Sequence, residues 1–91
     1  MTIRHDPDGA RFVLARDGRE AVLRYRMRGE DHIHFITTWV PPQDRGAGDG
    51  ARLVKAGLDH AREHGMTVST SCWFVDEFVD RNPGYAALMD G

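Results

Sequence analysis

Apolar residues recur at alternate positions in two segments near the start of the chain, positions 10–16 and 19–28. In positions 10–16, Phe12 and Leu14 fall on one face, and the Asp17-Gly18 pair that follows is typical of a hairpin turn. Positions 19–28 repeat the alternation, which predicts a second, half-buried antiparallel strand. Positions 32–40, HIHFITTWV, carry β-branched and aromatic residues on both faces, which favours a third strand in the middle of a sheet.

The pattern changes to a helical period after Pro41 and Pro42, which offer no N–H to a strand ladder and therefore end the third strand. A glycine-rich turn follows, and behind it an apolar stripe at helical spacing predicts an amphipathic helix. That stripe consists of Leu53, Val54, Leu58 and Ala61. Gly65 is a natural terminator for the helix.

Three shorter elements are expected in the last third of the chain. Positions 66–74, MTVSTSCWF, are typical of a fourth strand. Apolar residues at helical spacing then predict a short helix, and they are Phe74, Val75, Phe78 and Val79. Asn82 and Pro83 suit the N-cap and first position of a last helical turn over positions 84–89.

The expected order of elements is β-β-β-α-β-α, which places the chain in the α+β (mixed α/β) class. The first three strands should form an antiparallel meander, because short turns join them. The long helix connects the third strand to the fourth as a crossover, so these two strands should run parallel. A length of 91 residues is typical of one domain, and we expect positions 1–91 to form a single one.

Composition and charge narrow the function classes. There are 12 Lys and Arg against 14 Asp and Glu, a net charge of −2 that offers nucleic acid or an anionic membrane no basic surplus. Cys72 is the only cysteine, which excludes an intrachain disulfide and a cysteine-built zinc site. His32 and His34 alone are a weak metal pattern, so we expect no metal. Without a signal-like or membrane-spanning segment, the cytoplasm is the expected location.

The turn before the long helix raises the main functional question. It reads QDRGAGDG from Gln43 to Gly50. One interpretation is a flexible connection. The other is a cradle of backbone N–H groups for phosphate, because a helix N-terminus leaves its first N–H groups unpaired and carries a partial positive charge. Arg45 adds a guanidinium group suited to phosphate.

Two common phosphate loops fit this turn poorly. GAGDGA satisfies G-x-G-x-x-G/A, but the dinucleotide fingerprint needs an acidic residue about 20 positions later, where this chain reads MTVST. A Walker A loop needs Gly-Lys-Ser/Thr, which is absent. The better match is Gln43-x-x-Gly46-x-Gly48 between a strand and a helix, which resembles the pyrophosphate loop of the GNAT acetyltransferase superfamily.

The resemblance extends over most of the chain, roughly from Gly18 to Leu88. TTWVPPQDRGAGDGARLV followed by VSTSCWFVDEFVDRNPGY is similar to a small single-domain GNAT-like subgroup. This resemblance implies a minimal N-acetyltransferase domain that binds acetyl-CoA, a CoA thioester, and transfers its acetyl group to an amine. The short chain leaves few walls on the acceptor side, so the acceptor could be large, such as a protein lysine or N-terminus.

The resemblance also implies roles for individual positions. The loop implied to wrap the CoA pyrophosphate comprises Arg45, Gly46, Ala47, Gly48, Asp49 and Gly50. Trp39 and Val40 match the strand end that pairs by backbone with the pantetheine arm, and Asn82 matches a C-terminal segment near the pantetheine. Cys72 and Tyr85 are the candidate catalytic residues, either of which could protonate the leaving thiolate.

Three positions depart from the subgroup. Thr37 stands where histidine is usual, and His34 should not replace it, because a regular strand turns residues three apart to opposite faces. Asp49 stands where an aliphatic residue is preferred, and its carboxylate would repel pyrophosphate unless it turned outward. Asn82 replaces the histidine of an R-H-P segment.

The candidates also have plain structural interpretations. Cys72 could be a small core residue, and Tyr85 and Trp39 could serve packing alone. The histidine missing at Thr37 favours a second hypothesis, a non-catalytic acyl-CoA-binding or protein-interaction module of the same fold. The retained Cys72 and Tyr85 favour the enzyme.

Overall fold

Five strands form one sheet in the computed structural model, which describes residues 1–90. The strands are β1 (Thr2–Asp6), β2 (Arg11–Arg16), β3 (Arg19–Met27), β4 (His32–Trp39) and β5 (Thr67–Thr70), and they lie side by side in chain order. The first four pair antiparallel, and β5 runs parallel to β4. The predicted α+β class and the parallel crossover are therefore confirmed.

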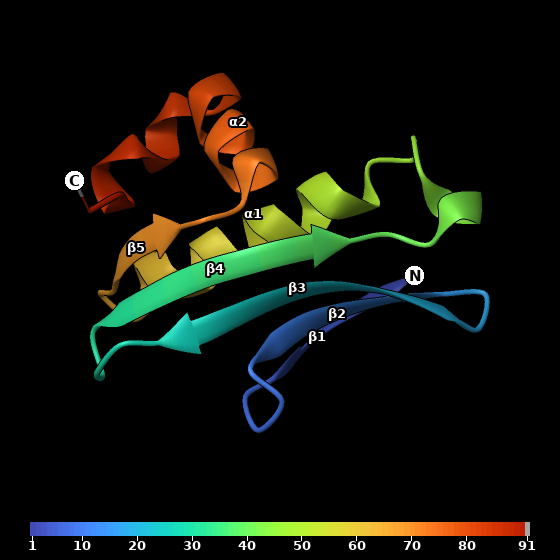
Figure 1. Ribbon diagram of the computed structural model, residues 1–91, viewed down its shortest axis with the longest axis horizontal. Coiled ribbons are helices and arrows are strands. Elements are labelled where there is room, and N and C mark those ends of the chain that lie inside the picture. Colours follow the sequence, from blue (N-terminus) through green and yellow to red (C-terminus); the bar gives the residue numbers. More distant parts are fainter. Residues whose placement is uncertain (91) are drawn as a thin grey trace.

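Two helices and two short 3-10 helices complete the fold. Helix α1 (Asp49–Glu63) makes the crossover from β4 to β5, and α2 (Trp73–Arg81) follows β5. The 3-10 helices are η1 (Pro42–Asp44), before the glycine turn, and η2 (Pro83–Leu88), near the end of the chain. Figure 1 shows α1 behind the sheet, with α2 and η2 beyond β5.

Two elements differ from the sequence prediction. The edge strand β1 was not expected, because its one large apolar residue, Ile3, gives no alternation, and the strand exists through its ladder with β2. The predicted strand over positions 66–74 ends early, at Thr70. There the Thr70 hydroxyl accepts a hydrogen bond from the Cys72 N–H at 2.9 Å, and the chain turns into α2, which begins at Trp73.

The apolar stripe of α1 packs on one face of the sheet and forms the core with it. Leu53, Val54 and Leu58 are fully buried there together with residues of β2 to β5 and of α2. Gly57 allows the close approach, because a Cβ at this position would lie 2.9 Å from side-chain carbons of Leu23 and Phe35. Helix and sheet are therefore in direct backbone-to-side-chain contact at this point.

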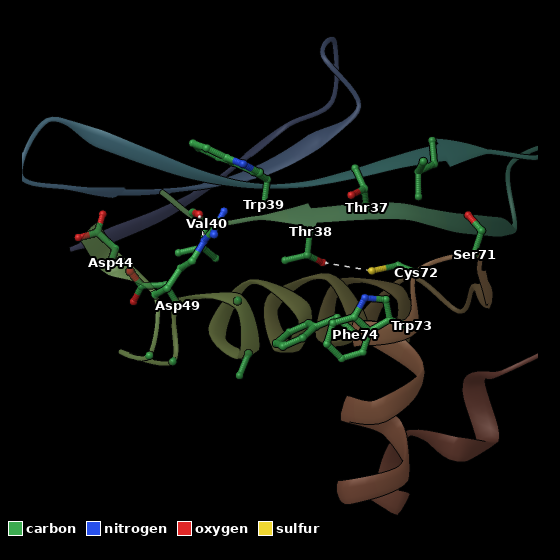
Figure 2. Close-up of a pocket in the computed structure, with 16 residues that line it drawn as sticks. Thr37, Thr38, Trp39, Val40, Asp44, Asp49, Ser71, Cys72, Trp73 and Phe74 are labelled. Carbon is green, nitrogen blue, oxygen red and sulfur yellow. Dashed lines mark hydrogen bonds between the residues drawn. The ribbon is translucent and has the colours of Figure 1, made fainter. Parts of the chain in front are cut away.

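A β-bulge interrupts β4 in the middle. Arg24 of β3 pairs with Thr37 and Tyr25 pairs with Phe35, so Ile36 is an extra residue without a partner on β3. An extra residue inverts the alternation of side chains beyond it. Figure 2 shows the result, since Thr38 points toward Cys72 whereas Thr37 points to the other side of the strand. The regular alternation expected for this strand is therefore wrong after Phe35.

Candidate functional site

Strands β4 and β5 part after Phe35 and leave a cavity of about 690 Å³. The Ser71 N–H and the Thr70 hydroxyl both donate to the Phe35 carbonyl, at 3.1 and 2.9 Å, and β5 then gives way to α2. The second half of β4 has no strand on this side within the described chain. The cavity walls are formed by positions 36–40, by positions 44–51 apart from Ala47, and by positions 71–74 (Figure 2).

The glycine turn presents a set of unpaired backbone N–H groups to this cavity. Gly46 and Gly48 adopt φ angles of 91° and 87°, a left-handed conformation that glycine takes without strain. In the glycine turn and the first turn of α1, five N–H groups have no acceptor among residues 1–90, and they belong to Gly46, Gly48, Asp49, Gly50 and Ala51. N–H groups gathered in this way at a helix N-terminus are an arrangement that binds anions.

Asp49, at the start of α1, is buried, with 2% of its surface exposed. Its two carboxylate oxygens accept hydrogen bonds from Arg16 at 2.9 and 2.7 Å. Arg52 donates to one of these oxygens at 3.0 Å and to the Ala47 carbonyl at 2.7 Å. The hydrogen bonds from Arg16 hold the pKa of Asp49 below its usual value. The carboxylate therefore turns inward and is paired with two guanidinium groups.

Asp44, at the other end of the turn, is bound in the same manner. Arg19 donates to its two carboxylate oxygens at 2.9 and 2.7 Å and thereby lowers the pKa of Asp44. Arg16 and Arg19 face each other as the last pair of the β2–β3 hairpin. The hairpin thus fixes both ends of the glycine turn. Sequence reasoning missed both arginines, whose only signal is their position on either side of the Asp17-Gly18 turn.

Cys72 lies in the cavity wall at the N-cap of α2. Its Sγ is 3.8 Å from the hydroxyl of Thr38, the residue that the bulge turns to this side. Trp39 and Trp73 stand on two rims of the cavity, with 50% and 71% of their surfaces exposed. The structure thus brings Cys72 together with Trp39, Val40 and the glycine turn.

The other residues predicted to bind the coenzyme lie at different places around the glycine turn. The Val40 carbonyl accepts a hydrogen bond from Arg45 Nε at 3.0 Å, so both residues lie where the turn leaves β4. Ala47 is exposed and contributes its carbonyl to Arg52 rather than a side chain to the cavity. Gly50 lies close to α2, because a Cβ there would be 3.1 Å from the Phe74 ring.

Tyr85 and Asn82 are not among the residues that line this cavity. The Tyr85 hydroxyl donates to Asp59 at 2.7 Å, and this hydrogen bond is the main reason why the pKa of Tyr85 is raised. The Asn82 side chain donates to the Phe78 carbonyl at 2.9 Å, beside a separate hollow of about 250 Å³. Their roles in catalysis and coenzyme binding stay predictions.

No group of three or more His, Cys, Asp and Glu side chains in residues 1–90 is arranged to hold a metal ion. None of the helices in the same range has the length and apolar character needed to cross a bilayer.

Comparison with known proteins gives consistent likenesses over nearly the whole chain. A family model described as GCN5-related N-acetyltransferase matches residues 11–88. The chain is 32% identical over 85 residues to Protein NATD1 of Bos taurus, which covers 91% of this chain and 75% of that protein. The corresponding protein of Gallus gallus is 31% identical, with 91% and 77% covered.

A solved structure agrees with the sequence relatives. The NMR solution structure of a GCN5-like protein from Staphylococcus aureus superposes with a TM-score of 0.74 at 26% identity. The superposition covers 99% of this chain and 88% of that one. These findings confirm the resemblance that the glycine turn and the segments CWFV and RNPGY indicate.

Proposed function

The chain belongs to the GCN5-related N-acetyltransferase family, and from that premise we propose that it transfers the acetyl group of acetyl-CoA to an amine. The observation that carries this proposal is the set of five unpaired N–H groups at the glycine turn, beside a cavity whose opposite wall is the free edge of β4. The turn would bind the diphosphate of the coenzyme. The cavity would take the pantetheine arm, with the backbone of Trp39 and Val40 beside it.

The residues at the turn fit a diphosphate. Arg45 and Arg52 add two guanidinium groups, and the carboxylate of Asp49 is neutralised within the protein. A side chain at Gly48 would fill the turn, because its Cβ would already lie 3.3 Å from Arg52 Nη1. When bound, the coenzyme supplies an activated acetyl group as a thioester.

Acetyl transfer forms a C–N bond and breaks the C–S bond, and three groups assist it. The carbonyl oxygen gains negative charge and needs a hydrogen-bond donor, for which we assign the N–H groups of β4 beyond Phe35 that point away from β3. The departing thiolate needs a proton, for which we assign the thiol of Cys72, held next to Thr38. The amine must give up a proton to a base.

A second candidate function is a non-catalytic module of the same fold that binds acyl-CoA or a protein. The specific observation in its favour is the cavity wall itself. Thr37 has no ionisable group, and the two carboxylates in the wall, Asp44 and Asp49, are both occupied by arginines. Turnover of acetyl-CoA with an amine separates the two functions.

The first test is calorimetric titration of the protein with acetyl-CoA, with NAD as a control ligand. We expect saturable binding of acetyl-CoA alone, and we expect Gly48→Trp to abolish it because the indole fills the turn. Gly65→Trp is the matched control, since Gly65 also has a positive φ but faces open space at the far end of α1. No binding of acetyl-CoA at millimolar concentration, or unchanged affinity in Gly48→Trp, would refute the proposed site.

A further inference from the structure

A row of hydrogen-bonded side chains runs along β4 and β5, on the face of the sheet opposite α1, and ends in the cavity wall. His32 of β4 lies 2.7 Å from both the Thr67 and the Ser69 hydroxyls. His34 lies 2.7 Å from the Ser69 hydroxyl and 3.2 Å from that of Ser71. Ser71 lines the cavity beside Cys72 (Figure 2). The row therefore connects two histidines with the candidate site.

Two directions of the hydrogen bonds satisfy this row, and the one with His32 protonated on Nδ1 is favoured because Nδ1 lies 3.9 Å from the Asp90 carboxylate. In this direction the Thr67 hydroxyl accepts from His32 Nδ1–H, and its own proton is directed toward the Asp31 carbonyl, 3.5 Å away. The unprotonated Nε2 of neutral His32 then accepts from the Ser69 hydroxyl, whose oxygen accepts from His34 Nδ1–H. His34 Nε2 therefore carries the free lone pair and accepts from the Ser71 hydroxyl.

The charges around His34 favour its neutral form. Burial is the main cause of its lowered pKa, and the positive charges of Arg28 and Arg26 and of a protonated His32 act in the same direction. Arg26 faces His34 from β3, and Arg28 lies in the turn after β3. The residues of β5 in the row are uncharged, and a carboxylate oxygen of Asp90 lies 3.9 Å from His32 Nδ1.

From this geometry we propose that Ser71 and His34 accept the proton that the acceptor amine loses. The amine N–H proton passes to Ser71 Oγ while the Ser71 hydroxyl proton passes to His34 Nε2, which becomes an imidazolium and later releases the proton to water. Ser71 is the group that touches the amine, and His34 acts through it. This inference rests on the proposed function and supplies the base that the transfer needs. It also revises the expectation that His34 faces away from Thr37, because the bulge at Ile36 puts both on one face.

The proposed row of hydrogen bonds can be tested without an amine substrate. Long-range ¹H–¹⁵N correlation spectra at pH 8 should show both His32 and His34 as the Nδ1–H tautomer. Ser71→Ala should raise the pKa of His34 in an NMR titration, because it removes the hydrogen bond that favours the neutral ring. A Nε2–H tautomer at His34, or an unchanged pKa in Ser71→Ala, would overturn the proposal while leaving acetyl-CoA binding intact.

The kinetic test measures release of the CoA thiol with acetyl-CoA and a short lysine peptide. In the unmodified protein, kcat/KM should rise with pH through the pKa of His34. His34→Gln should remove this limb and lower kcat/KM by about 10²-fold, a typical contribution of a general base. His64→Gln, at the exposed C-cap of α1, is the matched histidine control and should leave the profile unchanged.

Three other outcomes of these experiments would contradict either the proton relay or the proposed function. A pH limb that persists in His34→Gln would show that another group accepts the proton and would overturn the relay. Acetyl-CoA that binds but is never turned over would also overturn it, and would favour the non-catalytic module. Absence of acetyl-CoA binding would refute the proposed function itself.

Discussion

Asp49 begins α1 with a carboxylate that, alone, would compete with a bound anion for the positive end of the helix. Its hydrogen bonds with Arg16 and Arg52 remove this competition, because the three side chains together carry one positive charge. The lowered pKa of Asp49 keeps the group ionised and paired at neutral pH. An acidic residue at this position is therefore compatible with an anion site.

Cys72 allows a direct test of its role at the same scale. Cys72→Ala should lower kcat for acetyl transfer by about 10²-fold, because it removes the proton donor assigned to the thiolate. Cys72→Ser, which puts a hydroxyl in place of the thiol next to Thr38, should recover part of the rate. The dissociation constant for acetyl-CoA, measured by calorimetry, should stay similar in both variants. Undiminished turnover in Cys72→Ala would make this cysteine a packing residue.

The contact between α1 and the sheet depends on one residue without a side chain. Gly57→Ala should destabilise the fold by about 1–3 kcal/mol, a typical cost of overpacking, because the new Cβ would lie 2.9 Å from Leu23 and Phe35 carbons. The better helix propensity of alanine, about 1 kcal/mol, opposes this effect. Urea denaturation measures the difference. Gly84→Ala, in open space on η2, is the control and should change stability by less than about 0.5 kcal/mol.

Elements that bury a periodic apolar face could be predicted from the sequence. The strands β2 to β4 and helix α1 have such faces, and their order and pairing followed from them. The strand β1 could not be found in this way, since its pairing with β2 depends on a ladder and not on a buried stripe. The bulge at Ile36 left no signal either, because it arises from the register between β3 and β4.

In the candidate site, too, local features could be predicted from the sequence and long-range contacts could not. The glycine turn was predictable, because positive φ angles and a helix start both leave marks in the sequence. The arginines that fix its ends were not, since Arg16 and Arg19 reach Asp49 and Asp44 across 33 and 25 positions of the chain. Likewise, regular strand alternation places His34 and Thr37 on opposite faces, and the sequence does not reveal the bulge that brings them to one face.

At the scale of the whole molecule, the N-terminal strands are joined to the end of α1 by a group of aromatic rings. The His5 ring stacks on Phe12 with centroids 4.3 Å apart, and His60 of α1 meets it edge-on at 4.6 Å. The His5 Nε2 lies 2.6 Å from the Tyr25 hydroxyl, and His64 lies 4.1 Å from His60 between ring centroids. Three histidines therefore meet where the edge of the sheet contacts the helix.

This group predicts a loss of stability in mild acid. Burial is the first cause of the lowered pKa values of His5 and His60, so the unfolded chain binds more protons than the folded one. Stability should be complete above the unfolded value of 6.5 and fall as the pH drops through the lowered pKa values of the folded state. Thermal melting between pH 8 and pH 5 measures this.

A variant isolates the contribution of the histidines to that fall. His60→Gln removes one of the rings that must stay neutral, so its melting temperature should depend less on pH over the same interval. An identical pH dependence in the variant and the unmodified protein would assign the acid sensitivity to other groups.

The pairing of Arg16 and Arg19 with opposite ends of the glycine turn has a consequence for how this chain tolerates insertions. Surface hairpin loops usually accept extra residues, because few contacts depend on their length. Here the two-residue Asp17-Gly18 loop sets the spacing of two guanidinium groups that must reach Asp49 and Asp44 together. One added residue would rotate or displace one arginine relative to the other. Among related chains that keep these four residues, the loop should therefore vary in sequence but not in length.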